Sequence, residues 1–270
     1  MRKLLVYILT ALTVCSCEVI DEADRLIPLS PTHSSGRVHV LLEYTGCLCV
    51  NCPTAAQRAQ ELQELYGEQL MVIALHPATN HFTHSLYDYT CPEADSIYLS
   101  MGGTETTPFP KGNIDFLPME NEYLLDLNRW ATQLNNVMPD TVHPYVSAKA
   151  EYDSVNRSIA VTTILYAEQA LDAQLMTWLV EDSVTGAQMM PDGSVNTAYI
   201  HRHMLRASAD ATAWGTAVHI IPTTQQQTCV MPLPAACRPK HCRIVTLLVD
   251  THDHHLLQAY ETTLDFGARP

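Results

Sequence analysis

The chain is short of positive charge. Its 270 residues include only 15 lysines and arginines against 29 aspartates and glutamates, which gives a formal net charge of −14 at pH 7. A surface of that sign repels phosphate, so we exclude nucleic acid and anionic lipid headgroups as direct partners. The sequence also lacks a nucleotide-binding glycine loop, a Gly-x-Ser-x-Gly nucleophile elbow and a paired-carboxylate signature. We therefore expect no cofactor.

Long apolar runs are missing after the first residues. No later run approaches the roughly 20 residues that a membrane-spanning helix needs. At the start, two basic residues precede an apolar run from Leu4 to Val14, which is typical of an export signal. Cys17 follows a small residue, as in a bacterial lipobox, so we predict a lipoprotein signal over residues 1–17 with Cys17 lipidated. Cys15 is the weaker candidate, and an ordinary secretory signal is the alternative.

Residues 18–36 are polar and acidic and contain two prolines. This composition predicts a tether that holds a folded body away from a membrane. Acidic residues directly after a lipidated cysteine resemble the surface-export signal of Bacteroidetes-type lipoproteins. A solvated linker without such a signal explains the composition equally well.

A Cys-x-x-Cys pair, Cys49 and Cys52, follows a strand-like run over 38–44 and opens a helix-like run over 54–66. Unpaired N–H groups at a helix N-terminus favour thiolate over thiol, so a redox-active dithiol is the main hypothesis. A static disulfide is the second interpretation, because exported proteins often keep such bridges oxidised. A metal site is the third, and it would need a second pair of ligands.

The two halves of the remaining chain have different patterns. From 37 to 138, strand-like and helix-like runs alternate, and the apolar run 70–75 is typical of a central parallel strand. This β-α-β opening, with thiols at the first helix, predicts a thioredoxin-like α/β domain. From 139 to 270, alternating runs separated by turn residues predict an all-β, antiparallel sandwich. The expected strands are 145–152, 158–166, 174–181, 200–205, 217–221, 242–249 and 255–264.

Seven cysteines remain once the signal and the lipidated residue are set aside, so at least one thiol is free or pairs outside the molecule. Cys47 and Cys91 are candidates for a structural bridge; alternatively, Cys47 attacks the Cys49–Cys52 bond. In the second half we expect Cys242 to pair with Cys229 or Cys237 and to staple a hairpin.

Histidines cluster at three places in the sequence. Those near residue 80 are candidates to modulate a thiolate pKa. The other two clusters raise the question of a metal site, but we expect solvated hairpin turns and no metal, since linear clusters do not guarantee convergent ligands. The three groups are His76, His81 and His84; His201 and His203; and His252, His254 and His255.

Several segments together resemble the Omp28-related lipoproteins of Bacteroidetes-type bacteria. They are 41–46 leading to 49–53, Phe109-Pro110-Lys111-Gly112-Asn113, 179–182 with Gln188, His201 with Leu205-Arg206, and 257–259. The resemblance implies a thioredoxin-like domain, an immunoglobulin-like domain, and attachment to the outer membrane through the lipid anchor. It leaves open whether the body faces the periplasm or the cell surface.

The thioredoxin resemblance implies roles for individual residues. Cys49 would be the attacking thiol and Cys52 the resolving thiol. Glu43 would be a buried acid that relays the proton, and Pro110 a cis-proline that orients a bound peptide, with Pro108 as the competing candidate. The resulting expectation is thiol–disulfide exchange on exported proteins. The alternative is a non-enzymatic surface lipoprotein whose sandwich binds a surface ligand.

Overall fold

The first three strands build the part of the sheet that carries the cysteine pair. In the computed structural model, which describes residues 36–83, 89–138 and 144–267, β1 (His39–Tyr44) and β2 (Leu70–Leu75) are parallel, with Leu41 opposite Val72. All twelve of their residues are buried, as continuous apolar strands covered on both faces require. β3 (Lys111–Ile114) runs antiparallel to β1. The predicted signal, Cys17, nearly all of the tether and the predicted boundary after residue 138 lie outside the described residues.

Helix α1 (Cys52–Tyr66) connects β1 to β2. Its buried positions, Cys52, Ala55, Ala59 and Leu62, recur at three- and four-residue spacing, so one face packs on the sheet. The helix ends at Gly67, whose φ of 58° lies in the left-handed region that glycine tolerates best. The predicted helix is therefore confirmed.

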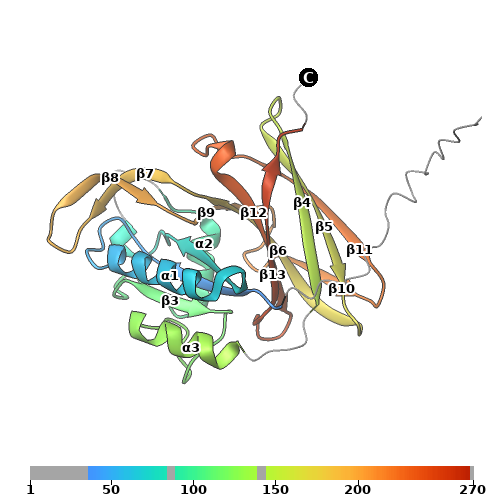
Figure 1. Cartoon of the computed structure of the whole chain (residues 1–270), viewed down its shortest axis with the longest axis horizontal. Helices are drawn as coiled ribbons and strands as arrows, with labels where there is room; N and C mark the ends of the chain where they lie inside the picture. The colour runs from blue at the N-terminus through green and yellow to red at the C-terminus, as the bar shows by residue number, and fades with distance from the viewer. Residues whose placement is uncertain (1–35, 84–88, 139–143, 268–270) are drawn as a thin grey trace, which may run out of the picture. The chain divides into compact units, whose positions relative to one another are not determined.

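Two further helices cover this end of the sheet (Figure 1). α3 (Trp130–Val137) shares an apolar cluster with α1 and the β1–β3 strands. α2 (Pro92–Ser100) contributes to a second cluster on the opposite face. Among the described residues, no helix is long and apolar enough to cross a membrane.

The sheet does not stop at β2. β9 (Met204–Ser208) lies parallel to β2, with Met204 opposite Ala74 and a 2.8 Å hydrogen bond from the Ala74 N–H to the His203 carbonyl. The full order is β11-β5-β4-β13-β12-β6-β9-β2-β1-β3, with β10 on β6, in one mixed sheet. The remaining bounds are β4 (Tyr145–Asp153), β5 (Ser158–Tyr166), β6 (Leu171–Glu181), β10 (Thr216–Ile220), β11 (Gln225–Pro232), β12 (Cys242–Asp250) and β13 (Leu256–Asp265).

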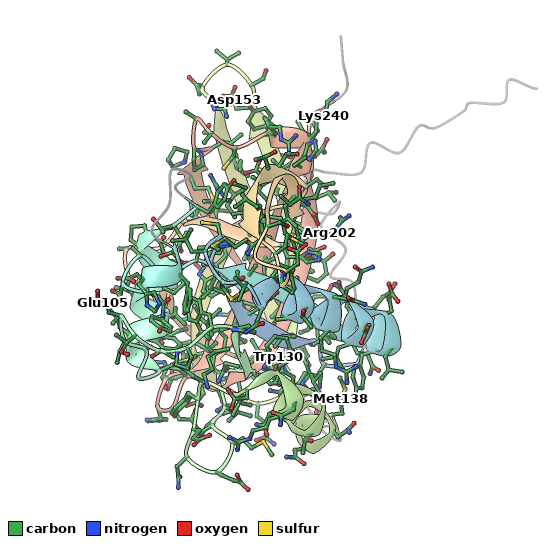
Figure 2. All side chains as sticks on the ribbon, turned by 90° about the vertical axis from the view of Figure 1, so that its left-hand side faces the viewer. Glu105, Trp130, Met138, Asp153, Arg202 and Lys240 are labelled. Atoms are coloured by element: carbon green, nitrogen blue, oxygen red, sulfur yellow. A yellow bond between two sulfur atoms is a disulfide. The ribbon has the colours of Figure 1, made fainter. Side chains whose placement is uncertain are left out.

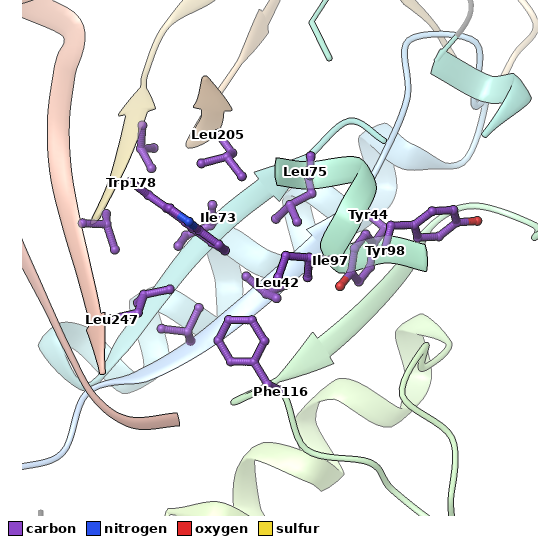
Figure 3. Packing of buried hydrophobic residues seen from close by; sticks show 14 of the residues in the cluster. Leu42, Tyr44, Ile73, Leu75, Ile97, Tyr98, Phe116, Trp178, Leu205 and Leu247 are labelled. Atoms are coloured by element: carbon purple, nitrogen blue, oxygen red, sulfur yellow. The ribbon is translucent and has the colours of Figure 1, made fainter. Parts of the chain in front are cut away.

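The predicted fold class, a thioredoxin-like α/β domain followed by an immunoglobulin-like sandwich, is wrong. Strands from both halves of the chain share one sheet, and they also share one core. In Figure 3, Leu42 and Ile73 from the first half pack with Trp178, Leu205 and Leu247 from the second. These side chains are fully buried, so the two halves remove each other's apolar surface from water.

A hairpin stands apart from the main sheet. Among the described strands, β7 (Val184–Met189) and β8 (Val195–His201) pair with each other alone, antiparallel, and form a two-stranded ribbon (Figure 1). Most of β8 is exposed. The ribbon therefore provides a wall beside helix α1.

Candidate functional site

Cys49 and Cys52 form a disulfide with a Cα–Cα distance of 5.4 Å. Cys49 lies in the loop after β1, and Cys52 is the first residue of α1. The exposed fractions are 1% for Cys49 and 2% for Cys52. The pair thus sits at the predicted strand-to-helix junction, but it is closed off from solvent.

Segments distant in sequence hold the loop that carries Cys49. The side-chain amide of Gln188, on β7, donates to the Cys49 carbonyl at 2.9 Å and to the Gly46 carbonyl at 3.3 Å. On another side, the Leu48 N–H donates to the Phe82 carbonyl at 2.9 Å. A Cβ on Gly46 would lie 2.5 Å from that same carbonyl oxygen, so only glycine allows this close approach.

Glu43 lies on β1, the strand that precedes the cysteine pair. It is 4% exposed, and its Oε1 has no hydrogen-bond partner. Burial raises the pKa of its carboxyl to about 8, because a charged carboxylate is poorly solvated there. The peptide bond between Phe109 and Pro110 is cis. The roles of Glu43 and Pro110 in an exchange reaction stay predictions.

The other described cysteines carry free thiols. Cys47 and Cys91 are both buried but belong to different apolar clusters, and burial raises the pKa of the Cys91 thiol to about 12. Cys237 and Cys242 lie close together, since their sulfurs and a Glu181 oxygen are all within 4.8 Å of one another. Of the two partners predicted for Cys242, the structure therefore brings Cys237 close.

Glu181, beside those two thiols, already has cationic partners. The Arg206 guanidinium lies 3.5 Å from its carboxylate, and the Arg238 guanidinium lies 3.8 Å away. The Arg238 backbone N–H also donates to it at 2.8 Å. These charges already compensate the buried carboxylate, and they would repel a metal cation at this position.

A cleft of about 410 Å³ lies between α1 and the β7–β8 hairpin. Figure 2 shows the hairpin end near Arg202 and the neighbouring helix. The floor comes from the α1 face of β1 and β2, including Glu43 and Ala74, and one wall comes from α1. Tyr199 and His201 line the opposite wall, on β8. Cys52 also lines this cleft, which places the buried acid and one cysteine on the same cavity.

Two buried imidazoles lie in the deepest part of the site. His76, directly after β2, is 2% exposed, and neither of its ring nitrogens has a hydrogen-bond partner. The ring centre of His201, the last residue of β8, lies 6.0 Å from that of His76, with the planes at 73°. Burial lowers the pKa of His76 to about 3 and that of His201 to about 4. Both rings are therefore neutral at pH 7.

The other predicted histidines are placed elsewhere or are not described. His81 is exposed and approaches the Glu105 carbonyl at 2.7 Å, while His84 lies outside the described residues. His254 and His255 occupy the turn between β12 and β13, where His254 stacks on Trp214 with ring centres 4.0 Å apart. The sequence analysis placed His76 and His201 in two separate histidine groups, and their proximity, which depends on how the hairpin folds, was missed.

Comparisons with known proteins agree with this architecture. The model of the family described as outer membrane protein Omp28 matches residues 105–265, which is more than half of the chain. The structure named HBP35 of Porphyromonas gingivalis has a TM-score of 0.69 at 14% identity and covers 87% of this chain and 78% of its own. That likeness spans both halves of the chain, as one continuous fold requires. No curated protein matches the sequence.

Two further solved structures are similar to this chain, one over most of its length and the other over about half. A protein from Agrobacterium tumefaciens has a TM-score of 0.51 at 12% identity and covers 87% of this chain and 98% of its own. A domain of the outer membrane lipoprotein Omp28 from Porphyromonas gingivalis has a TM-score of 0.34 at 14% identity and covers 47% of this chain and 92% of its own. At these identities the likeness concerns the fold and not the chemistry.

Proposed function

Since the chain belongs to the Omp28 family of outer membrane proteins, we propose that it is a non-enzymatic, lipid-anchored binding protein of the outer membrane. Its location at the outer membrane follows from the family. In this proposal Cys17 carries the lipid, and the described body binds a partner outside the bilayer. The Cys49–Cys52 disulfide is a structural element of the body.

The burial of the disulfide carries the proposal. Thiol–disulfide exchange requires a thiolate to reach a sulfur atom, so reactive pairs are partly exposed. Here Cys49 is 1% exposed and the loop around it is held by Gln188 and Phe82. A substrate would have to reach sulfur atoms of nearly fully buried residues, in a loop that those contacts hold in place. A static bridge that fixes the loop to the first residue of α1 needs no such access.

The cleft between α1 and the hairpin is the proposed binding surface. It is concave, and a few polar groups converge in it, which is the usual character of a ligand site. Ile200, which lines the cleft, and Val195, at the other end of β8, are each about half exposed. Apolar surface is therefore available beside the polar floor. A partner can therefore use both kinds of contact.

Alkylation of the folded chain tests this proposal. After mild reduction at neutral pH, we expect Cys49 and Cys52 to react with iodoacetamide at least tenfold more slowly than in the urea-unfolded chain, because their sulfurs are covered. The purified protein should not accelerate the reduction of insulin by a dithiol above the rate measured without protein. The Cys49→Ser variant should give that same protein-free rate. Rapid alkylation, together with insulin reduction that depends on Cys49, would contradict the proposal.

Thiol–disulfide exchange on exported proteins is the second candidate function. One observation favours it: Glu43 lines the same cleft as Cys52, and a carboxyl with a pKa of about 8 can take or give a proton near neutral pH. In that scheme Cys49 attacks a substrate disulfide and Cys52 resolves the mixed disulfide. The same assays decide between the two functions.

The anchor has its own test. Cys17→Ala should move the protein from the membrane fraction to the soluble fraction, because a diacyl-type anchor supplies most of the membrane affinity. Cys15→Ala is the matched control and should leave the fractionation unchanged. Retention of the Cys17→Ala protein in membranes would contradict lipidation at this residue.

A further inference from the structure

The two imidazoles in the cleft are unusual because three of their ring nitrogens have no hydrogen-bond partner. A buried nitrogen without a hydrogen bond destabilises the folded state, so such atoms are rare unless a ligand or water satisfies them. Neither nitrogen of His76 has a partner, and Nε2 of His201 has none. These atoms come from two segments far apart in sequence, the end of β2 and the end of β8.

The two nitrogens of the His201 ring have different surroundings. The Ala187 backbone on β7 acts on the ring and favours its protonated form. Nε2 has no hydrogen-bond partner. Metal-ligating histidines commonly have one ring nitrogen next to a backbone carbonyl while the other faces the ion.

The spacing of the two rings also fits one shared ion. Zinc–nitrogen bonds of about 2 Å put each ring centre about 3 Å from the metal, so two rings on one ion have centres about 5–6 Å apart. The observed separation is 6.0 Å, at the upper end of that range.

We propose that His76 and His201 bind one divalent transition-metal ion of the zinc class, with the remaining coordination positions open to the cleft. Imidazole nitrogen is a preferred ligand for zinc, copper and nickel. Glu43 lines the same cleft, but its carboxylate and the two rings do not all lie within 4.8 Å of one another, so the assignment rests on the two imidazoles.

One cationic side chain acts on His76: the Arg206 guanidinium lowers the pKa of that imidazole, and its charge is partly offset by Glu181 at 3.5 Å. Elsewhere in the described part of the chain, two groups of three side chains have ligand atoms within 4.8 Å of one another: Glu181 with Cys237 and Cys242, and Asp250 with Asp253 and His255. The first is already compensated by arginines, and the second is largely exposed. The experiment therefore has to show which of these three candidate sites binds the metal.

Metal content of the full chain provides the test. We expect the chelator-stripped protein, dialysed against zinc chloride and then washed, to retain one zinc per chain. His76→Gln and His201→Gln should each weaken zinc binding at least tenfold. His255→Gln and Cys242→Ser are the matched controls and should bind like the wild type. Retention that is lost only in a control variant, or no retention by the wild type, would overturn the proposal.

A measurement on the wild type covers the case in which a cleft variant fails to fold. With cobalt(II) in place of zinc, the visible bands of a nitrogen- and oxygen-ligated ion should appear without the near-ultraviolet thiolate band that Cys237 or Cys242 would produce. The ring signals of His76 and His201 should be broadened in NMR spectra, and those of His255 should not. A thiolate band, or unaffected cleft rings, would refute the assignment.

This inference deepens the proposed binding role, because it names a ligand for the cleft, and it can fail separately. If the wild type binds no zinc, the metal site is refuted, but the buried disulfide and the proposed non-enzymatic function are unaffected. If Cys49 is reactive, the non-enzymatic function is refuted, but the metal site at His76 and His201 is unaffected.

Discussion

Replacing Glu43 by glutamine should change how stability depends on pH. The carboxyl has a pKa of 4.5 when hydrated and about 8 in the folded protein, with burial as the cause. A raised folded pKa means that the folded state holds the proton more tightly than the unfolded state. Its contribution is therefore fully present below pH 4.5, and it is lost as the pH rises towards 8.

The size of the effect follows from the same two values. Each pKa unit corresponds to about 1.4 kcal/mol, so at pH 7 the buried carboxyl destabilises the folded state by about 3 kcal/mol relative to acidic pH. At pH 5 the corresponding cost is below about 1 kcal/mol. Glu43→Gln removes the titrating group, and any cost of burying the amide is the same at every pH.

Urea unfolding at pH 5, 6, 7 and 8 measures this difference. We expect the free energy of unfolding of Glu43→Gln minus that of the wild type to rise by about 2–3 kcal/mol between pH 5 and pH 7. Glu64→Gln, which removes an exposed carboxylate from α1, is the control and should show a difference that stays nearly flat. A flat difference for Glu43→Gln would refute the argument, because it would mean that the carboxyl is solvated in the folded protein.

Two other substitutions test contacts that hold this end of the sheet. Gly46→Ala should lower the free energy of unfolding by about 1–3 kcal/mol, because its Cβ would lie 2.5 Å from the Phe82 carbonyl oxygen; an unchanged urea midpoint would mean that the loop shifts freely. Asp115→Asn should cost about 3 kcal/mol, because the fully buried carboxylate lies 2.6 Å from Nδ1 of His39 and accepts the Val40 N–H at 2.8 Å. A loss below about 1 kcal/mol in thermal or urea unfolding would show that this network contributes little.

Local patterns predicted most individual elements. The apolar run 70–75 is β2, and the helical spacing after Cys52 is α1, ending at Gly67. Each of these depends on neighbours within a few residues, so periodicity is sufficient. One expected strand, 200–205, turned out to be the end of β8 and the start of β9, since the chain turns at Arg202 and His203.

The missed strands have physical reasons. β11 begins with three glutamines and forms an edge of the sheet, so its outward side chains show little apolar alternation. β7 contains a glycine and lies in the hairpin, apart from the main sheet. Neither segment has the apolar pattern that marks a buried strand.

The fold class was wrong because strand pairing is not a local property. Leu70–Leu75 predicts a strand with a neighbour on each side, but nothing in it identifies β9, about 130 residues later, as one of the two. Once β9 takes that place, β6 and β12 continue the sheet, and their side chains complete the core over β1 and β2. Near residue 139 the sequence changes from alternating strand-like and helix-like runs to strand-like runs alone. This change therefore marks a change of strand pattern within one sheet, and not a boundary between two folds.

The same limit applies to the site. The sequence placed Cys49 and Cys52 at the start of a helix, which is correct, and from that position we expected a reactive thiol. Reactivity also needs access, and both cysteines are buried in the folded chain. Gln188 and Phe82, which hold the backbone of the Cys49 loop, are too far away in the sequence for any spacing near the cysteines to indicate them. The hairpin that carries Gln188 also brings His201 to His76. One distant segment thus fixes the loop of Cys49 and completes the pair of imidazoles.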